Sequence, residues 1–74
     1  MTLADLPLGT AARVTAIDAS HDVIYRLMEM GLVRGTEVTV EKVAPRGDPM
    51  ELSVRGYLLS IRKREASRFT VQVL

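Results

Sequence analysis

The chain has 74 residues and no cysteine, and hydrophobic residues make up 47% of it. This composition is ordinary for a globular domain, and the length allows a single domain, residues 1–74. Without cysteine, neither disulfides nor thiolate metal sites can stabilise so small a fold. Ten basic and nine acidic residues are spread along the chain and give a formal charge of +1, which argues against a general nucleic-acid binder.

The N-terminal residues and the hydropathy pattern indicate where in the cell the protein is expected. No apolar run approaches 18 residues, and residues 1–9 contain Asp5 and no leading basic cluster. The sequence therefore predicts neither a membrane span nor a signal peptide, and we expect a cytoplasmic protein.

The first predicted strand covers residues 11–17, after a turn at residues 7–9. Ala12, Val14 and Ala16 alternate with polar side chains and would form its buried face. The period then changes to that of a helix over residues 21–30. The apolar face of this helix would hold Val23, Ile24, Leu27, Met28 and Met30.

Signals at both ends support this helix. Ser20 is the predicted N-cap, and Gly31 suits a left-handed residue that ends the helix. Asp22 and Arg26 have the spacing of an ion pair on one helix face.

The rest of the chain reads as strands separated by turns. A strand over residues 36–43 would bury Val38 and Val40, and the turn formers at residues 45–49 lead into a hairpin strand that begins at Met50. After a bend at Gly56, we expect a short strand over residues 57–61, one helical turn over 62–67 and a last strand in which Phe69, Val71 and Val73 alternate. Five short strands with one helix predict a small barrel, in which closure removes exposed edges.

Few residues are suited to chemistry. His21 is the only histidine, and the side chain of its neighbour Ser20 would diverge from it at a helix start. Gly31 and Gly35 are not followed by the lysine of a phosphate-binding loop, and no carboxylates show calcium-loop spacing. We therefore expect no enzymatic activity, no cofactor and no metal site, and interpret His21 as part of a solvated helix end, with a weak, adventitious metal contact as the alternative.

Two surface features remain as candidate binding sites. Arg62, Lys63, Arg64 and Arg68 form the one basic cluster. This cluster is interpreted as a solvated turn, as a docking site for an acidic protein or membrane surface, or as a nucleic-acid site, the last disfavoured by the scarcity of aromatic residues. Met28 and Met30 border the apolar face of the predicted helix, where they serve either as core residues or as adaptable contacts for a partner.

Several segments, in order, resemble the ferrous iron transport protein A family. They include the opening residues 3–9, the stretch Arg26-Leu27-Met28-Glu29-Met30-Gly31-Leu32 leading to residues 35–38, residues 45–49, residues 56–63 and residues 65–66. Together they cover nearly the whole chain. One departure is Arg34, where family members often carry proline, which costs some rigidity in the turn and adds a charge near the helix exit.

The resemblance implies a mainly β, SH3-like barrel with a helix between the first two strands and a short helical turn before the last. It also implies a non-enzymatic accessory role in bacterial ferrous iron uptake. The partner would be the cytoplasmic part of the membrane GTPase-permease called ferrous iron transport protein B, so the protein would be peripheral at the inner membrane only through that partner.

A contact hypothesis follows from the helix and this expected partner. We expect Met28, Met30 and Leu32 to make apolar contacts, with Tyr25, Arg26 and Glu29 as a polar rim. The alternatives are a domain related to iron-dependent repressors in metal-responsive regulation, a small RNA-binding barrel and a direct iron sensor.

Overall fold

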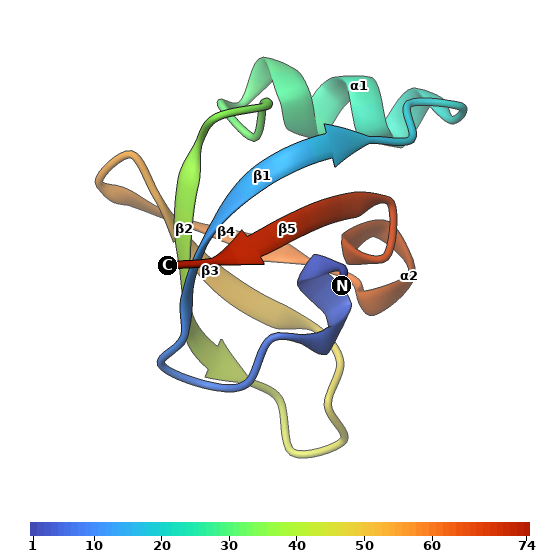
Figure 1. The fold of residues 1–74 in the computed structure, drawn as a ribbon. Coiled ribbons are helices and arrows are strands. Elements are labelled where there is room, and N and C mark those ends of the chain that lie inside the picture. Colours follow the sequence, from blue (N-terminus) through green and yellow to red (C-terminus); the bar gives the residue numbers. More distant parts are fainter.

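The computed structural model describes all residues 1–74 as a curved five-stranded sheet with three short helices. In chain order the elements are η1 (Leu3–Asp5), β1 (Ala11–Ile17), α1 (Asp22–Glu29), β2 (Glu37–Val43), β3 (Met50–Val54), β4 (Tyr57–Ile61), α2 (Lys63–Ala66) and β5 (Phe69–Val73). The strand order is β4-β3-β2-β1-β5, and all neighbours are antiparallel. The sheet curls into a small barrel, with α1 at one end and η1 and α2 packed together at its side (Figure 1). The predicted strands and the placing of the two predicted helices are confirmed.

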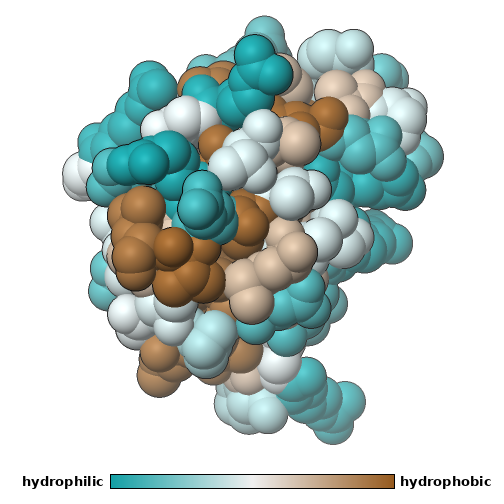
Figure 2. Space-filling view, viewed as in Figure 1, coloured by the Kyte–Doolittle hydropathy of each residue, from teal (hydrophilic) through white to brown (hydrophobic).

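The alternating patterns of the sequence correctly identify most of the core. Along β3, Met50, Leu52 and Val54 are buried, as predicted for one face of a hairpin strand. Phe69 and Val71 of β5 are also buried, but Val73 is half exposed at the end of that strand. Around the C-terminal end of β5, Figure 2 shows a hydrophobic area bordered by hydrophilic atoms.

Ala16 is an exception to the predicted strand pattern, because it faces solvent. The pairing of β1 with β5 shifts between Val14 and Ala16, which marks a β-bulge. An extra residue in one strand reverses the side to which the following side chains point, so Ile17 rather than Ala16 packs against the core. The prediction of a buried Ala16 is therefore wrong.

The N-terminal segment forms an element that the sequence did not predict. Leu3 of η1 is completely buried. The backbone N–H of Thr2 donates to Asp5 Oδ2 at 3.0 Å, and Lys63 Nζ of α2 donates to the carbonyl of Ala4 at 3.2 Å. These contacts fix η1 beside α2 and make the first residues part of the barrel. Neither α1 nor α2 is long and apolar enough to cross a membrane.

Candidate functional site

The helix α1 carries most of the candidate contact residues, and the structure makes it two residues shorter than predicted. It spans Asp22–Glu29, with His21 and Met30 as the flanking residues. Its inner side is anchored by Ile24 and Leu27, which are both buried in the core. The helix is therefore held against the barrel by two large aliphatic side chains.

The predicted cap at the start of α1 is wrong. Ser20 lies one residue too early, and no side chain caps the first amides of the helix. Ser20 Oγ instead accepts a hydrogen bond from Arg68 Nη1 at 3.5 Å. The predicted pair of Asp22 with Arg26 is not formed either.

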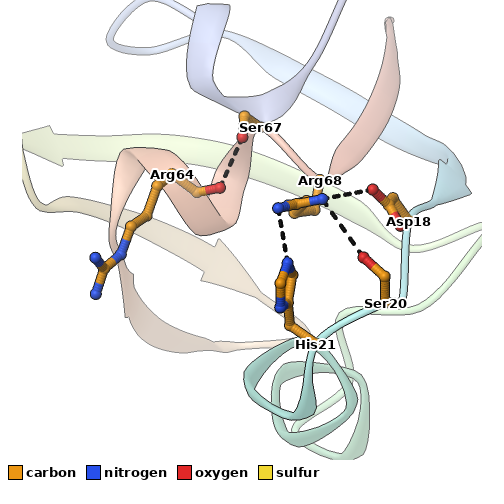
Figure 3. Close-up of polar contacts among 6 residues, drawn as sticks. All are labelled: Asp18, Ser20, His21, Arg64, Ser67 and Arg68. Carbon is orange, nitrogen blue, oxygen red and sulfur yellow. Dashed lines mark hydrogen bonds and ion pairs between the residues drawn. The ribbon is translucent and has the colours of Figure 1, made fainter.

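Arg68 ties the loop before α1 to the turn between α2 and β5 (Figure 3). Its Nη1 lies 2.7 Å from Asp18 Oδ2, and its Nη2 lies 2.8 Å from His21 Nε2. A guanidinium has only donors, so the histidine nitrogen accepts. The backbone N–H of Asp18 also donates to the carbonyl of Arg68 at 2.8 Å. His21 thus has a structural partner, consistent with its interpretation as part of the helix end.

The same arginine affects the ionisation of Asp18. Its hydrogen bond to the charged carboxylate holds the pKa of Asp18 below the ordinary value, and a hydrogen bond from Ser20 acts in the same direction. Both side chains of the ion pair are partly exposed, so solvent screens most of the attraction. We therefore assign Arg68 mainly a positioning role at the start of α1.

The other end of α1 is held by the β3–β4 hairpin. Gly31 has a φ of +106°, which confirms the predicted left-handed residue after the helix. Its carbonyl accepts from Thr36 Oγ1 at 3.0 Å, and that hydroxyl accepts from Arg55 Nη2 at 3.3 Å. A Cβ at position 31 would lie 3.2 Å from the hydroxyl oxygen of Tyr57. No local pattern signalled these contacts, because Arg55 and Tyr57 are far from the helix in sequence.

The predicted contact residues on α1 differ in accessibility. Tyr25 is 57% exposed and Met30, just after the helix, is 46% exposed. Met28 is half-buried and packs against the core. Arg26 and Glu29 are exposed, and neither forms an ion pair. Five of the six predicted residues can therefore reach a partner, Met28 only in part.

Leu32 cannot make the predicted contact, because its side chain is completely buried. Its backbone N–H donates to the carbonyl of Leu27 at 3.2 Å, so the chain folds back over the end of α1 after Gly31. An apolar residue in this position commonly packs against the last turn of the helix. That helix-end motif, visible in the sequence, is the signal that should have assigned Leu32 to the core.

The exposed apolar groups lie on two flanks of α1. At about 100° per residue, Met30 projects about 20° from Val23, whereas Tyr25 lies about 60° from Met28 on the opposite flank. Val23, predicted on the buried face, is 36% exposed. Arg26 and Glu29 lie between the flanks. We call the exposed side of α1 with Met30 the α1 surface, consisting of Val23, Tyr25, Arg26, Met28, Glu29 and Met30.

The predicted basic cluster is divided by contacts within the protein. Arg68 bonds to the loop before α1, and Lys63 bonds to η1. Arg62 Nη1 lies 4.0 Å from Asp48 Oδ2, and the backbone N–H of Lys63 donates to Asp48 Oδ1 at 2.9 Å. Of these four side chains, only that of Arg64 is exposed and forms neither an ion pair nor a hydrogen bond. The four side chains therefore do not present a single cationic surface.

A shallow cleft of about 410 Å³ separates the first turn of α1 from α2. Its lining combines two arginines, a glutamate and a histidine with two aliphatic side chains, namely His21, Val23, Ile24, Arg64, Glu65 and Arg68. No group of three or more histidine, aspartate or glutamate side chains gathers anywhere in the structure. The arrangement provides surfaces for contact and no set of side chains that would hold a metal ion by itself.

Comparison with known proteins gives the family. The model of the FeoA domain matches residues 1–73. The chain belongs to the FeoA domain family. It is 44% identical to the FeoA protein of Chlorobium tepidum, whose solution structure superimposes with a TM-score of 0.92 over 100% of this chain and 70% of that one.

Two other relatives of the FeoA family bear on function. A Stenotrophomonas maltophilia FeoA crystallised with zinc is 38% identical, with a TM-score of 0.84 over 97% of this chain and 89% of that one. It is described as a prokaryotic SH3 domain protein, with a suggested role as a ferrous iron transport activating factor. The predicted SH3-like fold is thereby confirmed. A fusion of Fe²⁺ transport protein A with the Fe²⁺ transporter FeoB, from Porphyromonas gingivalis, is 30% identical over the whole chain, which spans only 9% of that relative.

The barrel also occurs outside the FeoA family. A manganese-dependent transcriptional repressor in complex with manganese matches 100% of this chain and 36% of its own with a TM-score of 0.88. At 14% identity, this likeness shows the fold alone.

Proposed function

We propose that the protein is a non-enzymatic accessory module of bacterial ferrous iron uptake that docks through its α1 surface on the cytoplasmic part of a FeoB-type GTPase-permease. The main support is the relative in which an FeoA domain and FeoB form one polypeptide. Covalent fusion keeps two modules at high effective concentration, as suits partners that act together.

The geometry of α1 supports this choice of surface. The helix is fixed at its start by Arg68 and at its end by the Thr36–Gly31 hydrogen bond, while Tyr25 and Met30 stay exposed. A rigid helix loses little conformational entropy on binding. Exposed methionine and tyrosine side chains also suit a small, reversible interface with a polar rim.

The decisive experiment measures folding and association together. Met30→Asp places a charge at an exposed position, so the melting temperature should change by less than about 4 °C. Calorimetric binding to the purified cytoplasmic GTPase region of the transporter should weaken by at least about tenfold, because the carboxylate must be desolvated in the interface.

A matched control is Leu8→Asp, in the exposed loop before β1, at the opposite end of the barrel from α1 (Figure 1). This variant should bind like the parent protein. Unchanged binding by Met30→Asp, or equal losses in both variants, would contradict docking through the α1 surface.

The RNA-binding alternative is less well supported. Its basis was the basic cluster, in which Arg68 and Lys63 bond within the protein. Binding to single-stranded RNA with a steep dependence on salt would be needed to revive it.

A further inference from the structure

The two edge strands of the sheet, β5 and β4, differ in whether another segment pairs with their outer side. The edge of β5 is covered by the chain's own N-terminal segment, because the Val71 N–H donates to the carbonyl of Met1 at 3.0 Å and Thr2 bridges Thr70. β4 is at the other end of the strand order, and no segment pairs with its outer side. The prediction that closure removes exposed edges is therefore wrong, because β4 and β5 do not pair and the barrel has one covered edge and one open edge.

The turn between β3 and β4 determines which backbone groups face the open edge. Two residues, Arg55 and Gly56, join the paired residues Val54 and Tyr57, and both have positive φ angles, +49° and +89°. Such a two-residue turn makes its flanking residues a hydrogen-bonded pair. In an antiparallel ladder, hydrogen-bonded pairs then alternate with pairs whose N–H and C=O groups point outward.

This alternation leaves Leu58 and Ser60 with their backbone groups directed away from β3. No hydrogen bond outside the ladder, from backbone or side chain, satisfies these groups. The Leu58 side chain is 57% exposed, and that of Ser60 is exposed as well. β4 thus offers two donors, two acceptors and an exposed aliphatic side chain to an incoming strand.

β4 also lacks the features by which proteins usually protect an open edge. Its pairing with β3 is regular, whereas the bulges of this sheet lie in β1 and β2. It contains neither proline nor lysine. Such an unprotected edge is a template for strand addition.

We propose that the outer edge of β4 binds an extended, acidic segment of a protein partner as a sixth strand. Arginines flank the edge at both ends, with Arg55 before β4 and Arg62 and Arg64 after it. Arg55 also donates a hydrogen bond to Thr36 Oγ1 at 3.3 Å, so the less engaged charges lie at the α2 end of the edge. The guanidinium of Arg64 is unpaired, and Arg62 has only a distant contact with Asp48. Acidic residues at both ends of an added strand would meet these charges.

The same charges disfavour a second copy of this chain. Antiparallel pairing of two β4 strands about Leu59 would use all the free groups, since Leu58 would pair with Ser60 of the second copy. In that register Arg55, in the β3–β4 turn, and Lys63 of the other chain, at the start of α2, are the equivalent positions just beyond both ends of the paired strands. Like charges brought close together there oppose this pairing. This inference is independent of the α1 surface, because Met30→Asp leaves the β4 edge unchanged.

The test removes one edge donor without changing the β3–β4 ladder. Ser60→Pro deletes an N–H that points outward, and proline is tolerated on edge strands. Ser60→Ala, the matched control, keeps that N–H. The probe is a blocked synthetic peptide, Asp-Asp-Val-Thr-Val-Asp-Asp, added to ¹⁵N-labelled protein and followed by NMR, which detects millimolar binding.

We expect shifts centred on β4 and slower amide exchange at Leu58 and Ser60. Ser60→Pro should bind the peptide at least about tenfold more weakly, and Ser60→Ala should bind it like the parent protein. A peptide with alternate backbone nitrogens methylated should not bind. This second comparison tests the ladder even if Ser60→Pro fails to fold.

Three outcomes would overturn the proposal. Shifts that map away from β4, or no shifts at all, would exclude strand addition at this edge. Equal binding of a peptide with lysines in place of the aspartates would exclude an acidic segment. Concentration-dependent dimerisation of the parent protein that Ser60→Pro abolishes would make a second copy the occupant.

Discussion

Arg68 and His21 are 47 residues apart in the chain, yet Nη2 of the arginine lies 2.8 Å from Nε2 of the histidine. The same guanidinium bonds to Asp18 Oδ2, so one side chain joins the turn before β5 to the loop before α1. The orientation of the proposed contact helix therefore depends on a residue outside it.

Replacement of Arg68 by alanine should destabilise the fold. The change removes hydrogen bonds to Asp18 and His21, and we expect the free energy of unfolding to fall in urea denaturation. Arg64→Ala removes an exposed guanidinium without a partner and should change it by less than about 0.5 kcal/mol. Equal effects of the two substitutions would show that the Arg68 contacts contribute nothing to stability.

Lowering the pH should weaken the hydrogen bond between Arg68 and Asp18. The pKa of Asp18 is lowered in the folded protein, so the folded state binds this proton less readily than the unfolded state. Its contribution to stability is therefore complete above the ordinary value of 3.8 and is lost as the pH falls through the lower folded pKa. The pKa of Asp5, lowered by hydrogen bonds from Thr2, adds to this loss in the same pH range.

The measurement for this prediction is urea unfolding at several pH values between about 2 and 6. Asp18→Asn should flatten the acid side of the stability profile. In an Arg68→Ala background the same substitution should have a smaller effect, because the main hydrogen bond that lowers the pKa of Asp18 is already absent and only that from Ser20 remains. A full effect in that background would refute Arg68 as the cause.

Alanine at Gly31 should be more costly than alanine at Gly9. Both glycines have positive φ angles, but only at Gly31 would the added Cβ meet another atom, the Tyr57 hydroxyl at 3.2 Å. The backbone strain alone costs about 1–2 kcal/mol at each position, and the contact should add to it at Gly31. Thermal unfolding of both variants measures the difference. If Tyr57→Phe does not reduce the extra cost at Gly31, the hydroxyl is not its source.

Alanine at Leu32 should lower the stability of the fold, whereas alanine at Met30 should mainly weaken partner binding. Leu32→Ala empties a completely buried site and should cost about 2–5 kcal/mol of unfolding free energy. Met30→Ala shortens a half-exposed side chain, so its stability should change by less than about 1 kcal/mol, while binding to the proposed partner weakens. A small effect for Leu32→Ala would restore this residue as a candidate contact.

The elements that sequence reasoning predicts well are those whose signal is local. Alternation along β3 identified Met50, Leu52 and Val54, and the helical period with Gly31 identified α1 within one residue at each end. Exposure of Met30 at the border of the helix followed from the same periodicity.

The failures arise from contacts between distant parts of the chain. Ser20 fits the preferences for a helix cap, but Arg68 competes for its hydroxyl. Ala16 fits the strand pattern until the pairing with β5 introduces a bulge. Neither η1 nor the open edge of β4 has a periodic signal, because each depends on which segment lies beside it in the folded barrel.

The position of β1 within the sheet has a consequence for biosynthesis. It pairs with β2 on one side and with β5 on the other, and β5 also supplies the buried ring of Phe69. A nascent polypeptide from which β5 has not yet emerged lacks one neighbour of β1 and the ring of Phe69, the largest fully buried side chain of the core. Maturation of this domain must therefore await the emergence of β5, and quality-control proteases would encounter an unfinished sheet until then.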